Sequence, residues 1–245
     1  MIQISDNVKL EENGKNFVLN IPEDSKEEIK LNLDKEVEIK IIVGKSSEVK
    51  VVSFSKKNKN VEIDVDDNGK IDWIDFSLGE GVKSYVKTNL NGINSEGNSL
   101  NIVFGDNSSE FELDNKVVHK GNNSKSDMVV RAVMNEKAKV MQTGLVKVSK
   151  NAVNCEGYQK SDVILLSEDA YAEAVPNLEI ENNEVKCSHG ATVSQIDEDK
   201  LFYLQSRGLS LKEAKRVIVE GFFEPVLKEF EGLREEIMER VDNLE

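Results

Sequence analysis

The chain has 245 residues, of which 38% are hydrophobic and 32% charged, and its formal net charge is −14. Nucleic acids and anionic membrane surfaces bind clustered Lys and Arg, so this acidity argues against both as partners. Two cysteines are too few for a disulfide scaffold. The first residues lack a secretory signal, and no apolar run could span a bilayer. We therefore expect a cytoplasmic protein with reduced thiols.

Short strands are predicted from about residue 8 to residue 195. Several segments alternate apolar and polar residues, the period of a strand with one buried face. These segments are residues 37–41, 48–52, 61–65 and 146–148. Turn-forming residues separate the strands, at 44–47, 66–69, 91–92, 105–107 and 121–123.

The strand region favours a β-solenoid over a sandwich or barrel. It is about 190 residues long, which is large for one sandwich. Aromatic residues make up only 6% of the chain, and its apolar residues are mainly Val and Ile, which stack well in ladders. No strict repeat is visible, so the sandwich stays open as the alternative on pattern alone.

Helices are predicted after residue 196. Asp197 or Asp199 can cap a short helix that Gly208 stops. Residues 210–213 (SLKE) form a capping box that opens a second helix, and Pro225 should kink or end it. An apolar stripe then predicts a third helix, formed by Leu227, Phe230, Leu233, Ile237, Val241 and Leu244. The predicted domains are thus a β core over 1–195 and a helical domain over 196–245.

Cys187 and His189 are the candidate ligands for a metal or iron–sulfur cluster. In an extended segment they project from the same face, and a thiol beside an imidazole suits soft metals. The alternative is that His189 is structural. His119, next to a turn, is expected at the surface, and Cys155 is expected to be a small packed residue. Residues 44–46 (GKS) are interpreted as a turn, because Ile39 stands where a phosphate-binding loop needs glycine.

From about residue 125 to residue 226 the chain resembles the SufB/SufD family of the SUF iron–sulfur cluster assembly system. Four segments carry the resemblance: 154–162 (NCEGYQKSD), 175–180 (VPNLEI), 186–193 (KCSHGATV) and 201–209 (LFYLQSRGL). The family implies a right-handed parallel β-helix followed by a small C-terminal helical domain. Two such β-helices join side by side, and each helical domain docks a SufC-type ABC ATPase.

The resemblance also implies site residues. Cys187 and His189 match the SufD-like Cys-x-His-Gly-Ala pattern. The essential cysteine of the SufB branch is matched here by Ile180, and an acidic residue by Gly190, so the site looks SufD-like. The ATPase-docking residues implied are Phe202, Tyr203, Arg207, Phe222, Phe223 and Pro225. No tightly bound cofactor is expected, only a transient iron–sulfur cluster.

The leading hypothesis is a non-enzymatic assembly scaffold that binds the ATPase and pairs with itself or with a SufB-like paralogue. A self-associating structural β-solenoid without a cluster role is the alternative. A solenoid enzyme acting on a saccharide or acyl donor has no paired-carboxylate or transferase motif to support it.

Overall fold

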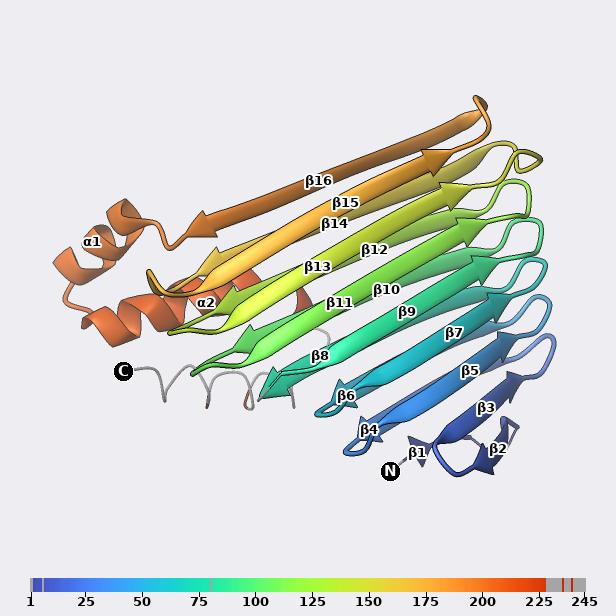
Figure 1. Ribbon diagram of the computed structural model, residues 1–245, viewed down its shortest axis with the longest axis horizontal. Coiled ribbons are helices and arrows are strands. Elements are labelled where there is room, and N and C mark those ends of the chain that lie inside the picture. Colours follow the sequence, from blue (N-terminus) through green and yellow to red (C-terminus); the bar gives the residue numbers. More distant parts are fainter. Residues whose placement is uncertain (1, 6, 80, 228–234, 236–238, 240–245) are drawn as a thin grey trace.

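The computed structural model describes residues 2–5, 7–79, 81–227, 235 and 239. Within them the chain forms two eight-stranded sheets followed by two helices (Figure 1). The protein is therefore mainly β, a parallel β-solenoid with C-terminal helices, which confirms the predicted fold class. The predicted third helix beyond Leu227 lies outside the described residues.

Consecutive strands from β3 onward alternate between the two sheets, so each coil of the solenoid contributes one strand to each. Sheet A contains β1 (Ile2–Gln3), β4 (Lys26–Leu33), β6 (Glu48–Ser55), β8 (Lys70–Gly79), β10 (Glu96–Gly105), β12 (Lys125–Met134), β14 (Cys155–Leu165) and β16 (Val185–Gln195). Sheet B contains β2 (Lys9–Asn13), β3 (Asn16–Ile21), β5 (Val37–Val43), β7 (Lys59–Val65), β9 (Lys83–Leu90), β11 (Glu110–His119), β13 (Lys139–Val148) and β15 (Tyr171–Ile180).

The coils lengthen along the chain, as the longer strands toward β16 in Figure 1 show. Stacked residues are 22 apart at Lys26 and Glu48, but 29 apart at Asn91 and Lys120. They are 32 apart at Lys147 and Glu179. A period that grows in this way explains why the sequence shows no strict repeat.

One row of turns repeats a left-handed backbone conformation from coil to coil. Its residues all have φ between 53° and 57°: Asp24, Ser46, Asn68, Asn94, Asn123 and Asn154. Each donates its backbone N–H to a carbonyl of the following turn, at 2.7–2.9 Å. The asparagine side chains also stack, with Asn94 Nδ2 3.0 Å from Asn68 Oδ1. Asn and Asp tolerate positive φ better than most residues, so the turn-rich sequence suits this row.

The interior is an apolar column of Val, Ile and Leu with a buried ion pair inside it. Lys59 Nζ lies 2.6 Å from Asp75 Oδ2, and both side chains are shielded from solvent. Hydroxyl groups complete the network: Lys59 donates to Ser55 at 2.7 Å, and Ser77 donates to Asp75 at 3.2 Å. Burial lowers the pKa of Lys59, and Asp75 opposes that shift.

The two ends of the solenoid differ. At the first end, β1 pairs antiparallel with β4 and β2 pairs antiparallel with β3. Residues there, including Ile2, Ile4 and Val8, pack against the core. At the other end β15 and β16 are the outermost strands of their sheets. Their outer edges carry backbone groups that no further strand of the described chain pairs with.

Helices α1 (Glu198–Ser206) and α2 (Leu211–Leu227) follow β16. Asp197 caps α1 by accepting a hydrogen bond from the Lys200 N–H, as predicted. The capping box is also confirmed, since Ser210 Oγ and the Glu213 carboxylate satisfy each other's backbone N–H. Of the two effects predicted for Pro225, ending the helix is wrong, because α2 continues to Leu227.

Helix α2 covers part of the outer face of sheet A. Its buried side chains Val219 and Phe223 pack against outward-facing residues of several strands, which include Val52, Ile74, Phe76, Ile102, Phe104 and Val133. The apolar residues on this second face explain why the carboxyl halves of β10 and β12 contain continuous apolar runs, at residues 102–104 and 132–134.

Candidate functional site

The candidate ligands Cys187 and His189 lie on β16, the last strand of sheet A. Cys187 pairs in register with Gly157 and His189 with Gln159. Both partners are buried inside the solenoid, whereas Cys187 is half-buried and His189 exposed. The two side chains therefore share the inward-facing side of β16, as the alternation predicted. They reach solvent because β16 belongs to the last coil.

The surroundings of the Cys187 thiol favour its protonated form. Its pKa lies above the ordinary value, mainly because burial disfavours the thiolate, while a hydrogen bond from the Gly157 backbone opposes the shift. Because a thiolate is the metal-binding form, a metal must displace this proton. Without a metal, the free chain therefore carries a weakly reactive thiol.

A second cluster of polar side chains, around Cys155 and His119, lies inside the solenoid beneath Cys187. The surface position predicted for His119 is wrong, because its side chain is fully buried. His119 Nδ1 lies 2.8 Å from Ser124 Oγ, and Nε2 lies 2.9 Å from Ser126 Oγ. Burial lowers the pKa of His119 to about 4, so the ring is neutral near pH 7. Cys155 is buried as predicted, 3.3 Å from Ser124 Oγ.

Gly157 of β14 lies next to both Cys187 and His119. A Cβ added there would lie 3.3 Å from His119 Nε2 and 3.4 Å from Cys187 Sγ. It would also clash with Val146 at 2.7 Å. The contact with Val146 therefore favours glycine at this position, which lies next to both the imidazole and the thiol. The sequence did not indicate this proximity, because His119 and Cys187 come near the same glycine only through the stacking of coils.

The metal-ligand candidates Cys187 and His189 both lie on the inward-facing side of β16, the outermost strand of sheet A among the described residues. In the part of the chain that the structure describes, no group of three or more His, Cys, Asp or Glu side chains is arranged to hold a metal ion. Iron–sulfur clusters are typically held by four protein ligands. The two candidates Cys187 and His189 are fewer than such a cluster needs.

The predicted docking residues of α1 are at the surface. Phe202 is 73% exposed and Tyr203 56% exposed. The Arg207 guanidinium lies 5.3 Å from the centre of the Tyr203 ring, a cation–π contact. Exposed aromatic side chains held in this way are typical anchors for a protein partner.

An apolar hollow of about 410 Å³ lies between α1, α2 and β14. Its lining residues are Ile164, Lys200, Tyr203, Leu204, Val217, Ile218, Gly221 and Phe222. Phe222 is half-buried in this wall, but Phe223 is fully buried against sheet A. In this conformation Phe223 therefore offers no surface to a partner and instead holds α2 in place.

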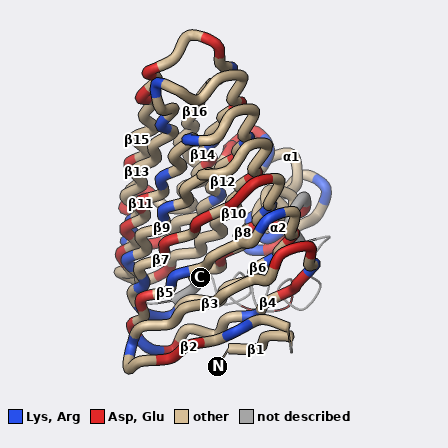
Figure 2. Tube along the Cα trace, turned by 90° about the vertical axis from the view of Figure 1, so that its right-hand side faces the viewer, with Lys and Arg blue, Asp and Glu red and all other residues tan. Residues whose placement is uncertain are grey.

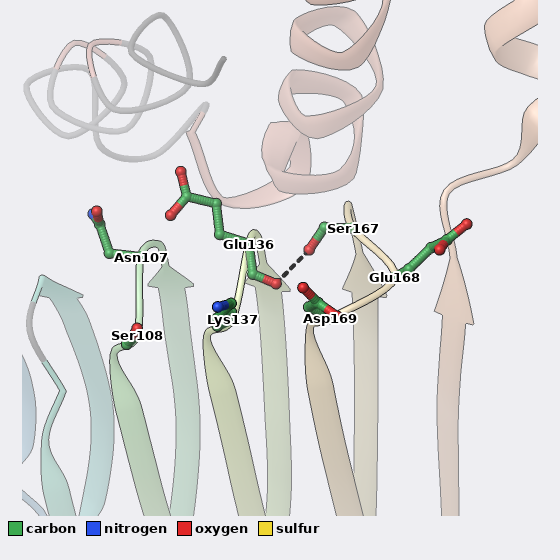
Figure 3. A pocket seen from close by; sticks show the side chains of 7 residues that line it. All are labelled: Asn107, Ser108, Glu136, Lys137, Ser167, Glu168 and Asp169. Carbon is green, nitrogen blue, oxygen red and sulfur yellow. Dashed lines mark hydrogen bonds between the residues drawn. The ribbon is translucent and has the colours of Figure 1, made fainter.

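A second hollow, shown in Figure 3, lies at the opposite row of turns, which follow β10, β12 and β14. Its lining is polar: Asn107, Ser108, Glu136, Lys137, Ser167, Glu168 and Asp169. The Ser167 hydroxyl donates to the Glu136 carbonyl at 2.6 Å. These are solvated turn residues, and their arrangement indicates no further chemistry.

No helix in the described part of the chain has both the length and the apolar character needed to cross a bilayer.

Comparison with known proteins adds family information to this geometry. Residues 12–222 match the family described as SUF system FeS cluster assembly, SufBD core domain. An iron–sulfur cluster assembly SufBD family protein of Staphylococcus saprophyticus is 32% identical over 164 residues, 66% of this chain and 35% of that protein. A protein of the same description from Staphylococcus epidermidis is 32% identical over 166 residues, 67% of this chain and 36% of that one. The match thus spans about a third of the length of these relatives.

Proposed function

Since the chain belongs to the SufBD family of the SUF system, whose role is iron–sulfur cluster assembly, we propose that it is a non-enzymatic scaffold of that pathway. In this proposal the helical segment docks a SufC-type ABC ATPase. The open end of the β-solenoid pairs with a second copy or with a SufB-like paralogue. A transient iron–sulfur cluster, the cargo of the scaffold, is held where the two solenoids meet.

The observation that carries this proposal is that Cys187, His189 and two strand edges, which no other described strand pairs with, lie at one end of the solenoid. An unpaired edge is a template for another strand. A partner that extends the sheets there would bring its own ligands beside Cys187 and His189. The missing half of the ligand set would then come from the second subunit.

The residues also bear on whether the chain builds clusters as a homodimer or with a paralogue. Ile180, at the end of β15, stands where the SufB branch has its essential cysteine. A homodimer of this chain would lack that thiol on both sides, so its clusters would depend on Cys187. A SufB-like paralogue would supply the thiol, which favours the heterodimer for cluster building.

The first experiment is co-purification of this chain with the SufC-type ATPase of its source, followed by light scattering. We expect a defined complex with two copies of each protein. Phe202→Ala should weaken it, because this aromatic side chain is the most exposed on α1. Tyr85→Ala, which removes an exposed aromatic side chain from β9, away from both proposed interfaces, is the matched control. A chain that never binds the folded ATPase would contradict the scaffold and leave the structural solenoid.

The cargo is tested separately by adding iron and sulfide under anaerobic conditions. The expected result is a visible chromophore that Cys187→Ser abolishes and the buried-site control Cys155→Ser retains. Protons compete with metal for both ligands, so the chromophore should weaken at low pH. A chromophore that survives in Cys187→Ser would reject Cys187 as a ligand.

A further inference from the structure

Arg131 connects the β-solenoid to helix α2. It lies half-buried on the outer face of β12, in register with Asp162 of β14. Its Nη1 donates a hydrogen bond to the backbone carbonyl of Phe222. Its guanidinium also lies 5.4 Å from the centre of the Phe222 ring. One arginine thus holds both the backbone and the ring of a single helical residue.

The turn of α2 that Arg131 holds is weak by composition. Pro225 has no N–H, so the carbonyl of Gly221 lacks its helical donor. Gly221 adds to the weakness, because glycine costs about 1 kcal/mol relative to alanine inside a helix. A charge-assisted hydrogen bond to the neighbouring carbonyl strengthens this turn.

Phe222 is part of the apolar hollow, together with Tyr203 and Val217. Its ring therefore contacts Arg131 and also contributes to the wall of the hollow. The next residue, Phe223, is buried against sheet A. A small rotation of this turn would move Phe222 out of the wall, and the contact with Arg131 opposes that rotation.

We propose that Arg131 is a positioning residue for the docking hollow. From the outer face of sheet A it holds the turn of α2 at Phe222, so that the hollow is already formed when an ATPase arrives. This inference rests on the proposed function, because the ATPase is the occupant of the hollow. Lysine would replace the charge but not the planar group that stacks on the ring.

The test measures ATPase affinity and hydrogen exchange of α2 in the full-length chain. Arg131→Met should weaken ATPase binding at least tenfold and raise exchange of the α2 amides, while Arg131→Lys should restore binding in part. Combined with Phe222→Leu, Arg131→Met should cost less than it does alone. Lys160→Met is the control, because Lys160 is a cation on the same face that pairs with Asp162 at 2.8 Å.

The outcomes separate this inference from the proposed function. If Arg131→Met binds the ATPase as the wild type does, the positioning role is wrong and the scaffold stands. The role is equally wrong if Lys160→Met weakens binding as much as Arg131→Met. If the wild-type chain does not bind the ATPase at all, the proposed function fails, and the role of Arg131 fails with it. A retained iron–sulfide chromophore in Arg131→Met would show that its solenoid end is intact.

Discussion

Individual side chains inside the solenoid carry large and separable contributions to stability. The Lys59–Asp75 pair is an example, because both groups are fully shielded from water. The attraction within a buried ion pair roughly balances the cost of desolvation, whereas one partner left alone is expensive. Removing one partner should therefore change the free energy of unfolding more than the intact pair contributes to it.

Asp75→Ala should lower the free energy of unfolding by about 3–5 kcal/mol, since it leaves the Lys59 ammonium buried without a counter-ion. The double variant Lys59→Met with Asp75→Leu should recover most of that loss. Urea unfolding of the three proteins checks both expectations. A double variant as unstable as Asp75→Ala would show that the ion pair itself, rather than the unpaired charge, is what matters.

His119 should make the protein sensitive to acid. Its pKa is about 4 in the fold and ordinarily 6.5, so the unfolded chain binds more protons between these values. The stability that depends on a neutral His119 is fully present above about pH 6.5. It is lost as the pH falls toward 4, which lowers the free energy of unfolding by about 3 kcal/mol. His119→Gln should flatten this part of the curve of unfolding free energy against pH. An unchanged slope would mean that other groups cause it.

At the scale of the elements, the row of left-handed turns sets the stacking of the coils. Asn94 is at its centre, with φ of 56° and side-chain hydrogen bonds to Asn68 and from Asn123. Positive φ costs a residue with a Cβ about 1–2 kcal/mol. The strain at this position is therefore as large as the stabilisation from several surface contacts.

Asn94→Gly should be more stable than Asn94→Ala by about 1 kcal/mol, because both lose the side-chain bonds but only alanine keeps the strain. Asn98 is the matched control, since it lies in the extended strand β10. There the order should reverse, with alanine more stable than glycine. Thermal unfolding of the four variants gives the comparison, and the same order at both sites would refute the explanation.

Charges on the faces of the solenoid are arranged across neighbouring strands. Lys40 pairs with Asp64, Lys87 with Glu62 and Lys83 with Glu112, at 2.8–3.2 Å. Figure 2 shows Lys and Arg interspersed with Asp and Glu along the strands. Each exposed pair contributes little by itself. Together they favour the register in which neighbouring strands pair.

For the whole molecule, the asymmetry of its ends predicts how it associates. The first end is covered by β1 and β2, whereas the outer edges of β15 and β16 pair with no other strand among the described residues. Ala191 and Val193 share the inward-facing side of β16 with Cys187, and Val193 is 43% exposed. A partner solenoid would bury this region.

Lysine at both Ala191 and Val193 should prevent pairing through this end, because charges on an edge strand block strand addition. Light scattering should then give a monomer, with an unchanged circular dichroism spectrum. Ile42→Lys is the control, because Ile42 is similarly exposed, 37%, but lies on β5 near the first end. A double variant that still dimerises, or pairs with its paralogue as the wild type does, would place the interface elsewhere.

The sequence alone predicted the local structure. This includes the alternating residues of β5 to β7, the turn residues between strands, the Asp197 cap and the capping box at Ser210. These features depend on neighbours within a few positions. The shared face of Cys187 and His189 followed for the same reason. Family motifs then indicated the β-helix and its helical segment.

Only the tertiary structure decided which residues meet across coils. It buried His119 beneath the last coils, where Gly157 brings it close to Cys187, and it turned Phe223 inward while leaving Phe222 in the hollow. These contacts join residues about one coil or more apart, and the coil grows from 22 to 32 residues. Because no constant period links such positions, stacking alone determines them.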